Sequence, residues 1–127
     1  MMDESPPASN MTLGKAPDIL FVEADPVSRR VVKDMLAGAG ARVIEATPEA
    51  VPDGAFALAI VDVDGEAAWA VLRSLRGHGE APMPTIAIVA TAALAQQGQA
   101  AGADEVLVEP VAMTALFDAI GRFLALS

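Results

Sequence analysis

The sequence predicts an α/β domain in which a parallel sheet carries helices on both faces. Short apolar runs alternate with segments that have apolar residues at helical spacing, the pattern of a doubly wound fold. Several of the runs lack the polar alternation of a half-exposed strand, as expected for strands buried on both faces. The 127 residues suffice for one domain with a single continuous core.

Three of the apolar runs end in an acidic residue. They are ILFVE at 19–23, AIVD at 59–62 and VLVE at 106–109. In an open parallel sheet, ligands bind outside the carboxyl ends of the strands. We therefore expect the three terminal acids to meet at one pocket.

Composition excludes several classes of protein. The apolar runs are far shorter than the roughly 18 residues that span a bilayer, and residues 1–17 lack the pattern of a secretory signal. With no cysteine there is no disulfide and no thiolate metal site. The formal net charge of -9, from 17 acids against 8 bases, is opposite to that of a nucleic-acid-binding surface. We expect a cytoplasmic protein that binds neither DNA nor a membrane.

Residues 1–17 are rich in Ser, Pro and Asn and are predicted to form a flexible tail before a domain at 18–127. Asp25 followed by Pro26 is typical of a helix start, with an acidic N-cap and a proline in the first turn. Glycines at and after Gly38 indicate the end of that helix. Its apolar face is expected to comprise Val31, Val32, Met35 and Leu36.

The middle of the chain predicts an edge strand at 42–46 and a central strand at 56–62. The segment between them, 47–54, is too short and too rich in proline for a full helix. A helix is expected over 66–76, with Trp69 near its start. Its inward residues are Val71, Leu72 and Leu75.

The C-terminal part predicts strands at 85–90 and 105–108, a weak helix at 91–101 and a strong one at 112–126. Gly98 lies in the middle of the weak helix, whose stability must come mostly from packing. With right-handed crossovers, the five strands form a doubly wound sheet of order 2-1-3-4-5, which is the flavodoxin-like arrangement.

Over roughly 18–126 the layout resembles the receiver domain of bacterial two-component response regulators. That family ends its first strand in two acids, its third in a phosphoacceptor aspartate and its fifth in Lys-Pro. The resemblance implies that Asp62 is the phosphoacceptor candidate. It also implies that the positions matching the family site are Glu23, Ala24, Val89 and Glu109.

The implied metal site departs from the family pattern. Receiver domains bind Mg²⁺, which prefers hard oxygen ligands in an octahedron. Glu23 and Asp62 are the implied ligands, but Ala24 lacks one of the two expected acids. Asp25 is expected to cap the helix, and Asp64 or Glu66 could contribute from the next loop. We therefore expect weak or absent Mg²⁺ binding and no other cofactor.

The implied phosphoryl site departs further from the family pattern than the metal site does. Val89 stands where the family has Thr or Ser, Val106 where it has an aromatic switch residue, and Glu109 where it has the lysine before Pro110. At about 4 Å two unit charges interact by roughly 1 to 4 kcal/mol. Replacing the attraction between the lysine and the phosphoryl group by the repulsion from Glu109 therefore matches or exceeds a typical allosteric coupling of roughly 1 to 3 kcal/mol. If Glu109 points inward, it should raise a carboxyl pKa.

The leading hypothesis is a pseudo-receiver: an atypical receiver in two-component signalling that acts through contact with a protein such as a histidine kinase. The family's usual contact face comprises the fourth helix, the fifth strand and the fifth helix, and a homodimer is also possible. One alternative is a functional phosphoacceptor at Asp62 in a phosphorelay, which Mg²⁺ binding would distinguish. Another is a nucleotide second-messenger sensor that uses Arg29 and Arg30. An enzyme is not expected, because no pair of nucleophile and base is visible and His78, between two glycines, is expected to be solvated.

Overall fold

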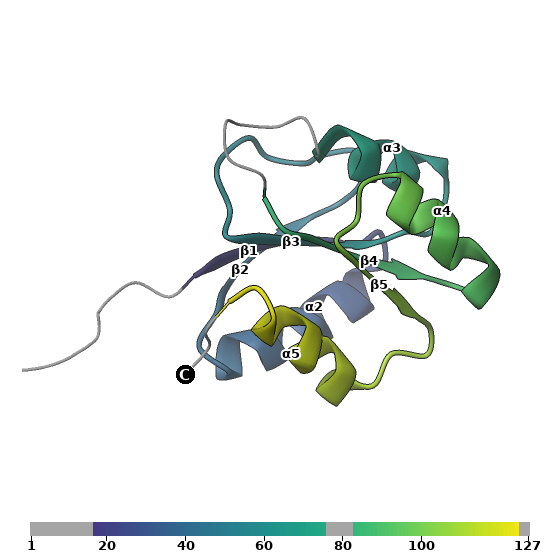
Figure 1. Cartoon of the computed structure of the whole chain (residues 1–127). Coiled ribbons are helices and arrows are strands. Elements are labelled where there is room, and N and C mark those ends of the chain that lie inside the picture. Colours follow the sequence, from purple (N-terminus) through teal and green to yellow (C-terminus); the bar gives the residue numbers. More distant parts are fainter. Residues whose placement is uncertain (1–16, 76–82, 125–127) are drawn as a thin grey trace, which may run out of the picture.

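The computed structural model describes residues 17–75 and 83–124. Five parallel strands form one sheet in the order β2-β1-β3-β4-β5 (Figure 1). Their bounds are β1 (Asp18–Val22), β2 (Arg42–Ala46), β3 (Leu58–Asp62), β4 (Thr85–Val89) and β5 (Glu105–Val108). The predicted fold class is thereby confirmed. Almost all of the predicted tail, and His78, lie outside the described residues.

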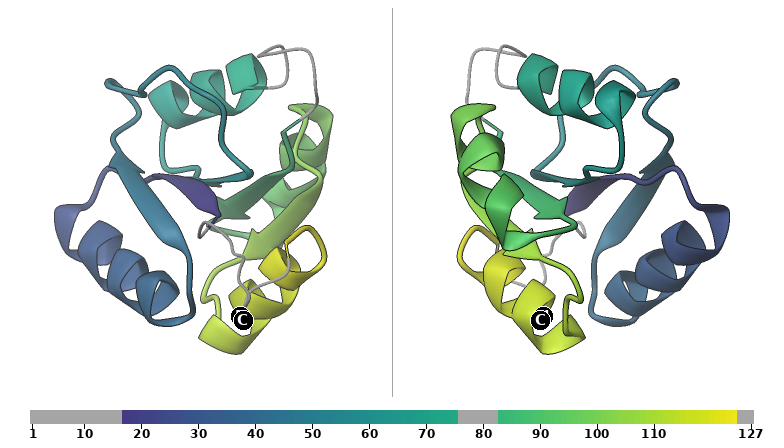
Figure 2. Two further views of the ribbon diagram at one scale, coloured as in Figure 1. Left: turned by 90° about the vertical axis from the view of Figure 1, so that its left-hand side faces the viewer. Right: turned by 90° about the vertical axis from the view of Figure 1, so that its right-hand side faces the viewer.

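Helices cover both faces of the sheet. They are α2 (Pro26–Gly38), α3 (Glu66–Leu75), the 3₁₀ turn η2 (Ala92–Leu94), α4 (Ala95–Ala100) and α5 (Met113–Gly121). Helices α3 and α4 lie on one face, and α2 and α5 on the other (Figures 1 and 2). Side chains alternate across each strand, so β1 contributes Leu20 and Val22 to the core under α3 and Ile19 and Phe21 to the core under α2.

Helix α2 begins and ends as predicted, but its buried face differs. Leu36 is fully buried and Val32 packs against the same core. Val31 and Met35 are instead 51% and 41% exposed, so the prediction that they face inward was wrong. Val32 and Leu36, which are four residues apart, face the sheet. Val31 and Met35 each lie one position earlier and are therefore turned about 100° toward solvent.

The segment between β2 and β3 forms no helix, as its prolines predicted. It contains one isolated antiparallel bridge, between Thr47 and Ala50. Strand β3 begins at Leu58, two residues later than predicted. In the described part of the chain, therefore, α3 and α4 are the only α-helices on that face of the sheet, and Val51 and Phe56 of the segment pack beside them.

The last two helices are shorter than predicted. The expected helix at 91–101 is divided into η2 and a six-residue α4, and α5 ends at Gly121 although Phe123 and Leu124 still pack on the core. Gly98 lets α4 approach β5 closely, because a Cβ there would lie 3.1 Å from Val106 Cγ2. No helix among the described residues is long and apolar enough to cross a membrane.

Candidate functional site

The parallel register brings the strand-terminal acids to one edge of the sheet. Val22 is paired with Val61, so Glu23, which follows β1, lies beside Asp62 at the end of β3. Glu109 follows β5, and its backbone N–H donates to the carbonyl of Val89 at 2.9 Å. The charges of Glu23 and Glu109 both act on Asp62. The three strand-terminal acids therefore lie at the same edge of the sheet.

Glu23 is held by its own loop. Although charged, it is only 5% exposed. Its carboxylate accepts a hydrogen bond from the backbone N–H of Asp25 at 3.1 Å, and its backbone N–H donates to the carbonyl of Ala46 at 3.0 Å. One carboxylate oxygen is thus already used within the loop.

Arg29 supports that loop from the first turns of α2. Its Nη1 donates to the backbone carbonyl of Glu23 at 2.8 Å, and its Nε donates to Oε1 of Glu45 at 3.3 Å. Lys33 pairs with the same carboxylate at 3.2 Å. The sequence suggested Arg29 only as a residue that a nucleotide sensor would use. Its position one helical turn after the N-cap is the only signal of this structural role.

The surroundings of Asp62 favour the protonated form of its carboxyl group. Its pKa is raised to about 8, first by burial, then by its hydrogen bond with Glu23 and by the charges of Glu23, Glu109 and Asp64. In its protonated form, the Asp62 carboxyl group can donate a hydrogen bond to Glu23. The expected contribution of Glu109 to a raised carboxyl pKa is present, but burial and Glu23 contribute more.

These residues do not fit a bound Mg²⁺. Ala24 is exposed and offers no side-chain oxygen. Asp25 caps α2, with its Oδ2 accepting from the N–H of Ser28 at 2.9 Å, and hydrogen bonds from the side chain and the backbone of Ser28 lower the pKa of Asp25. Within residues 17–75 and 83–124, no three His, Cys, Asp or Glu side chains come together as potential ligands.

The other positions of the predicted site supply no donor for a phosphoryl group. Val89 is fully buried at the end of β4 and has no hydroxyl. Thr91, the next hydroxyl along the chain, is exposed and begins the turn before α4. Glu109 is exposed and precedes Pro110 through a cis peptide bond. At this edge the chain thus offers acceptors and negative charge where an anion would need donors.

Comparison with solved structures shows the fold of response regulator receiver domains. A chemotaxis response regulator of Vibrio cholerae has a TM-score of 0.76 at 22% identity, covering 87% of this chain and 100% of that one. A Thermotoga maritima response regulator in complex with Mg²⁺ and BeF has a TM-score of 0.74 at 22% identity, and the match covers 85% of this chain and 99% of that one. A receiver domain of Methylobacillus flagellatus has a TM-score of 0.73 at 14% identity, and the match covers 87% of this chain and 100% of that one. No family model matches this sequence, and no curated protein does.

Proposed function

We propose that this chain is a pseudo-receiver of bacterial two-component signalling, without catalysis of its own, that acts through contact with a protein partner. The observation that carries the proposal is Glu109, an acid that acts on Asp62 from the position where receivers have a lysine. A phosphoryl group on Asp62 would meet negative charge rather than a cation. Its formation and its recognition would both be disfavoured.

Two further observations support the proposal. A carboxyl group that holds its proton at neutral pH is a poor nucleophile, and the pKa of Asp62 is raised to about 8. Ala24 and Val89 remove a metal ligand and a hydroxyl that phosphotransfer in receivers uses. The fold is retained while these parts are changed, which favours a role that depends on shape and surface.

The partner surface follows from analogy with the fold. Receivers use the face formed by α4, β5 and α5, which lie along one side of the molecule (Figure 2). Val108 on β5 is 37% exposed there. A histidine kinase or another signalling protein is the proposed partner, in the cytoplasm, and self-association through this face is the other assembly that the analogy suggests.

The experiment compares three alleles in the source cell by their regulatory output. Asp62→Asn removes the candidate phosphoacceptor and is expected to retain the output. Val108→Glu places a charge on the proposed contact face and should abolish it. Val27→Glu is the matched control, because it makes the same change at a residue that is 69% exposed on α2.

Loss of output in Asp62→Asn, with the protein still abundant, would contradict the proposal and favour a phosphoacceptor. Equal loss in both valine variants would contradict the assignment of the contact face. Circular dichroism of the purified variants checks that each remains folded.

A further inference from the structure

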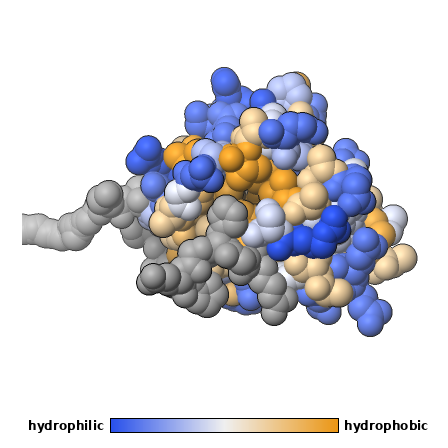
Figure 3. Space-filling view, turned by 90° about the horizontal axis from the view of Figure 1, so that it is seen from above, coloured by the Kyte–Doolittle hydropathy of each residue, from blue (hydrophilic) through white to orange (hydrophobic). Residues whose placement is uncertain are grey.

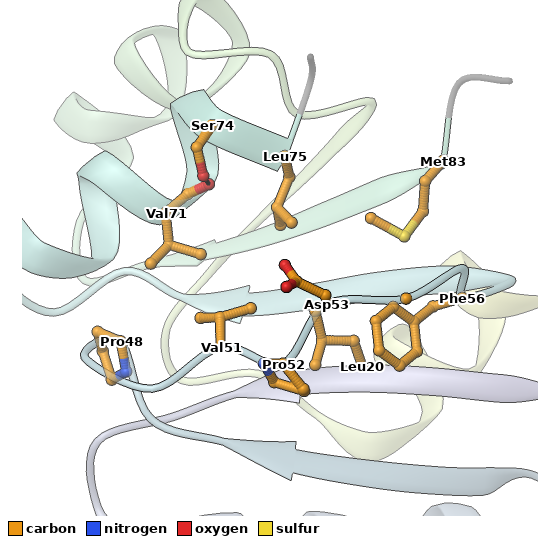
Figure 4. Close-up of a pocket in the computed structure, with 11 residues that line it drawn as sticks. Leu20, Pro48, Val51, Pro52, Asp53, Phe56, Val71, Ser74, Leu75 and Met83 are labelled. Carbon is orange, nitrogen blue, oxygen red and sulfur yellow. Dashed lines mark hydrogen bonds between the residues drawn. The ribbon is translucent and has the colours of Figure 1, made fainter. Parts of the chain in front are cut away.

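The helix-free segment between β2 and β3 leaves a cavity of about 260 Å³ between itself and α3 (Figure 4). Leu20 of β1 forms its floor, and Val71 and Leu75 of α3 form one wall. Val51 and Phe56 line the opposite side from the segment itself. In Figure 3, which shows the face covered by α3 and α4, hydrophobic side chains are exposed near the middle, with hydrophilic ones around them.

This cavity is separate from the acidic edge. Phe56 and Met83, which line it, precede β3 and β4, whereas Asp62 ends β3. A five-residue strand such as β3 spans roughly 15 Å. None of the cavity residues belongs to the candidate site described above. The inference drawn from the cavity is therefore independent of the proposed function.

The polar groups that line the cavity favour a positively charged ligand. Asp53 is the charged residue among the described residues of the lining, and Figure 4 shows its carboxylate directed between the segment and α3. Within residues 17–75 and 83–124, no lysine or arginine lines the cavity. No ion pair of Asp53 occurs within the described part of the chain. Ser74 donates its hydroxyl proton to the carbonyl of Val71 at 2.8 Å, which leaves the hydroxyl oxygen as an acceptor.

We propose that this cavity binds a small molecule with an apolar body and a single ammonium group. The apolar body would fill the space above Leu20, and the ammonium would pair with Asp53 at the rim. The volume suffices, since a cavity of about 150 Å³ accepts benzene. Nucleotides and other phosphate-bearing ligands are disfavoured, because the described residues of the lining offer a carboxylate and no cation.

Three matched probes test the proposal by amide NMR titration of the whole chain. 2-Phenylethylamine is cationic, 2-phenylethanol is neutral and phenylacetate is anionic, and all three have the same ring. The amine is expected to bind with a dissociation constant at least threefold below that of the alcohol, and phenylacetate more weakly than either. The shifted amides should include Val51, Phe56 and Val71.

Asp53→Asn is expected to remove the preference for the amine, so that it binds no better than the alcohol. Glu49→Gln is the matched control, because it neutralises an exposed acid of the same segment that does not line the cavity, and it should keep the preference. Val51→Trp should fill the space and weaken all three probes. A dispersed spectrum shows that each variant is folded.

Three results of the titrations with the probes would overturn the proposal. The first is the absence of shifts at these amides with any probe at millimolar concentration in the folded wild type. The second is phenylacetate binding as tightly as the amine. The third is a preference for the amine that survives Asp53→Asn. Shifts at the same amides on raising the protein concentration alone would also contradict it, by assigning the cavity to a second copy.

Discussion

At Asp62 one side chain meets three negative neighbours. Burial, the hydrogen bond with Glu23 and the charges of Glu23, Glu109 and Asp64 raise its pKa to about 8. The folded state therefore keeps a proton that the unfolded chain has lost from about pH 4 upward. Folding stability contributed by this group must fall as the pH rises from about 4 to about 8.

Asp62→Asn removes this titration while preserving the shape of the side chain. We expect the free energy of unfolding of the variant, relative to that of the wild type, to increase between pH 5 and pH 8.5. Because Asp62 is only partly buried, solvent screening limits the difference to on the order of 1 to 2 kcal/mol. Urea unfolding at the two pH values measures it.

Asp64→Asn serves as the control for that experiment, because Asp64 is exposed and contributes the smallest of the named effects on Asp62. It should change the pH dependence much less. A wild type that gains stability relative to Asp62→Asn between pH 5 and pH 8.5 would contradict the assignment of a raised pKa.

The contacts of Arg29 argue against one of the functional alternatives, the nucleotide sensor. A nucleotide sensor at Arg29 and Arg30 requires free guanidinium groups. Arg29 is instead engaged by the carbonyl of Glu23 and the carboxylate of Glu45. Binding a phosphate there would break contacts that hold the Glu23 loop, so the structure does not favour that alternative.

Among the elements, α2 shows what hydrophobic spacing alone leaves undecided. The helix has two neighbouring apolar stripes, and only tertiary packing selects the one that is buried. Leu36→Ala removes a fully buried side chain and is expected to lower the free energy of unfolding by about 2 to 5 kcal/mol. Met35→Ala, at the neighbouring and 41% exposed position, should change it by less than about 0.5 kcal/mol.

Chemical denaturation of both variants measures the contrast. Equal losses would mean that both stripes are buried, as the sequence predicted. A larger loss for Met35→Ala would mean that the stripe of Val31 and Met35 is the buried one.

Helix α4 depends on a close approach to β5. Alanine is normally preferred in a helix by up to about 1 kcal/mol, but a Cβ at Gly98 would lie 3.1 Å from the stiff, branched side chain of Val106. We expect Gly98→Ala to destabilise the protein by about 1 kcal/mol, because the contact outweighs the propensity. Thermal unfolding measures it.

A double-mutant cycle with Val106→Ala isolates the contact. Gly98→Ala should be harmless or stabilising once Val106 is truncated. Gly38→Ala is the control, since it also lies in a helix but has no atom within 4 Å of a Cβ, and it should not destabilise. Equal effects at the two glycines would indicate that α4 does not need this approach.

At the scale of the whole molecule, sequence patterns predicted the sheet order, the missing helix between β2 and β3, and the acidic edge. These depend on local signals, namely apolar runs, prolines and strand-terminal acids. The buried stripe of α2, the shortened α5 and the contacts of Arg29 depend on packing between distant segments. The cavity under α3 was not predicted, because its walls come from separate parts of the chain that meet only in the fold.

The proposal that this chain is a pseudo-receiver, with the receiver fold but without phosphotransfer at its acidic edge, also concerns the whole molecule. An amide NMR titration with Mg²⁺ and then beryllofluoride, the stand-in for a phosphoryl group, tests it most directly. The wild type is compared with Ala24→Asp combined with Glu109→Lys, which restores the family's acid and lysine.

We predict that the amides of Glu23, Asp62 and Val89 in the wild type do not shift at millimolar Mg²⁺, and that beryllofluoride adds nothing. In the restored variant, Mg²⁺ should shift these amides and beryllofluoride should shift them further. Wild-type shifts at these amides that spread to α4 and α5 would contradict the account and show that the site is active despite Glu109.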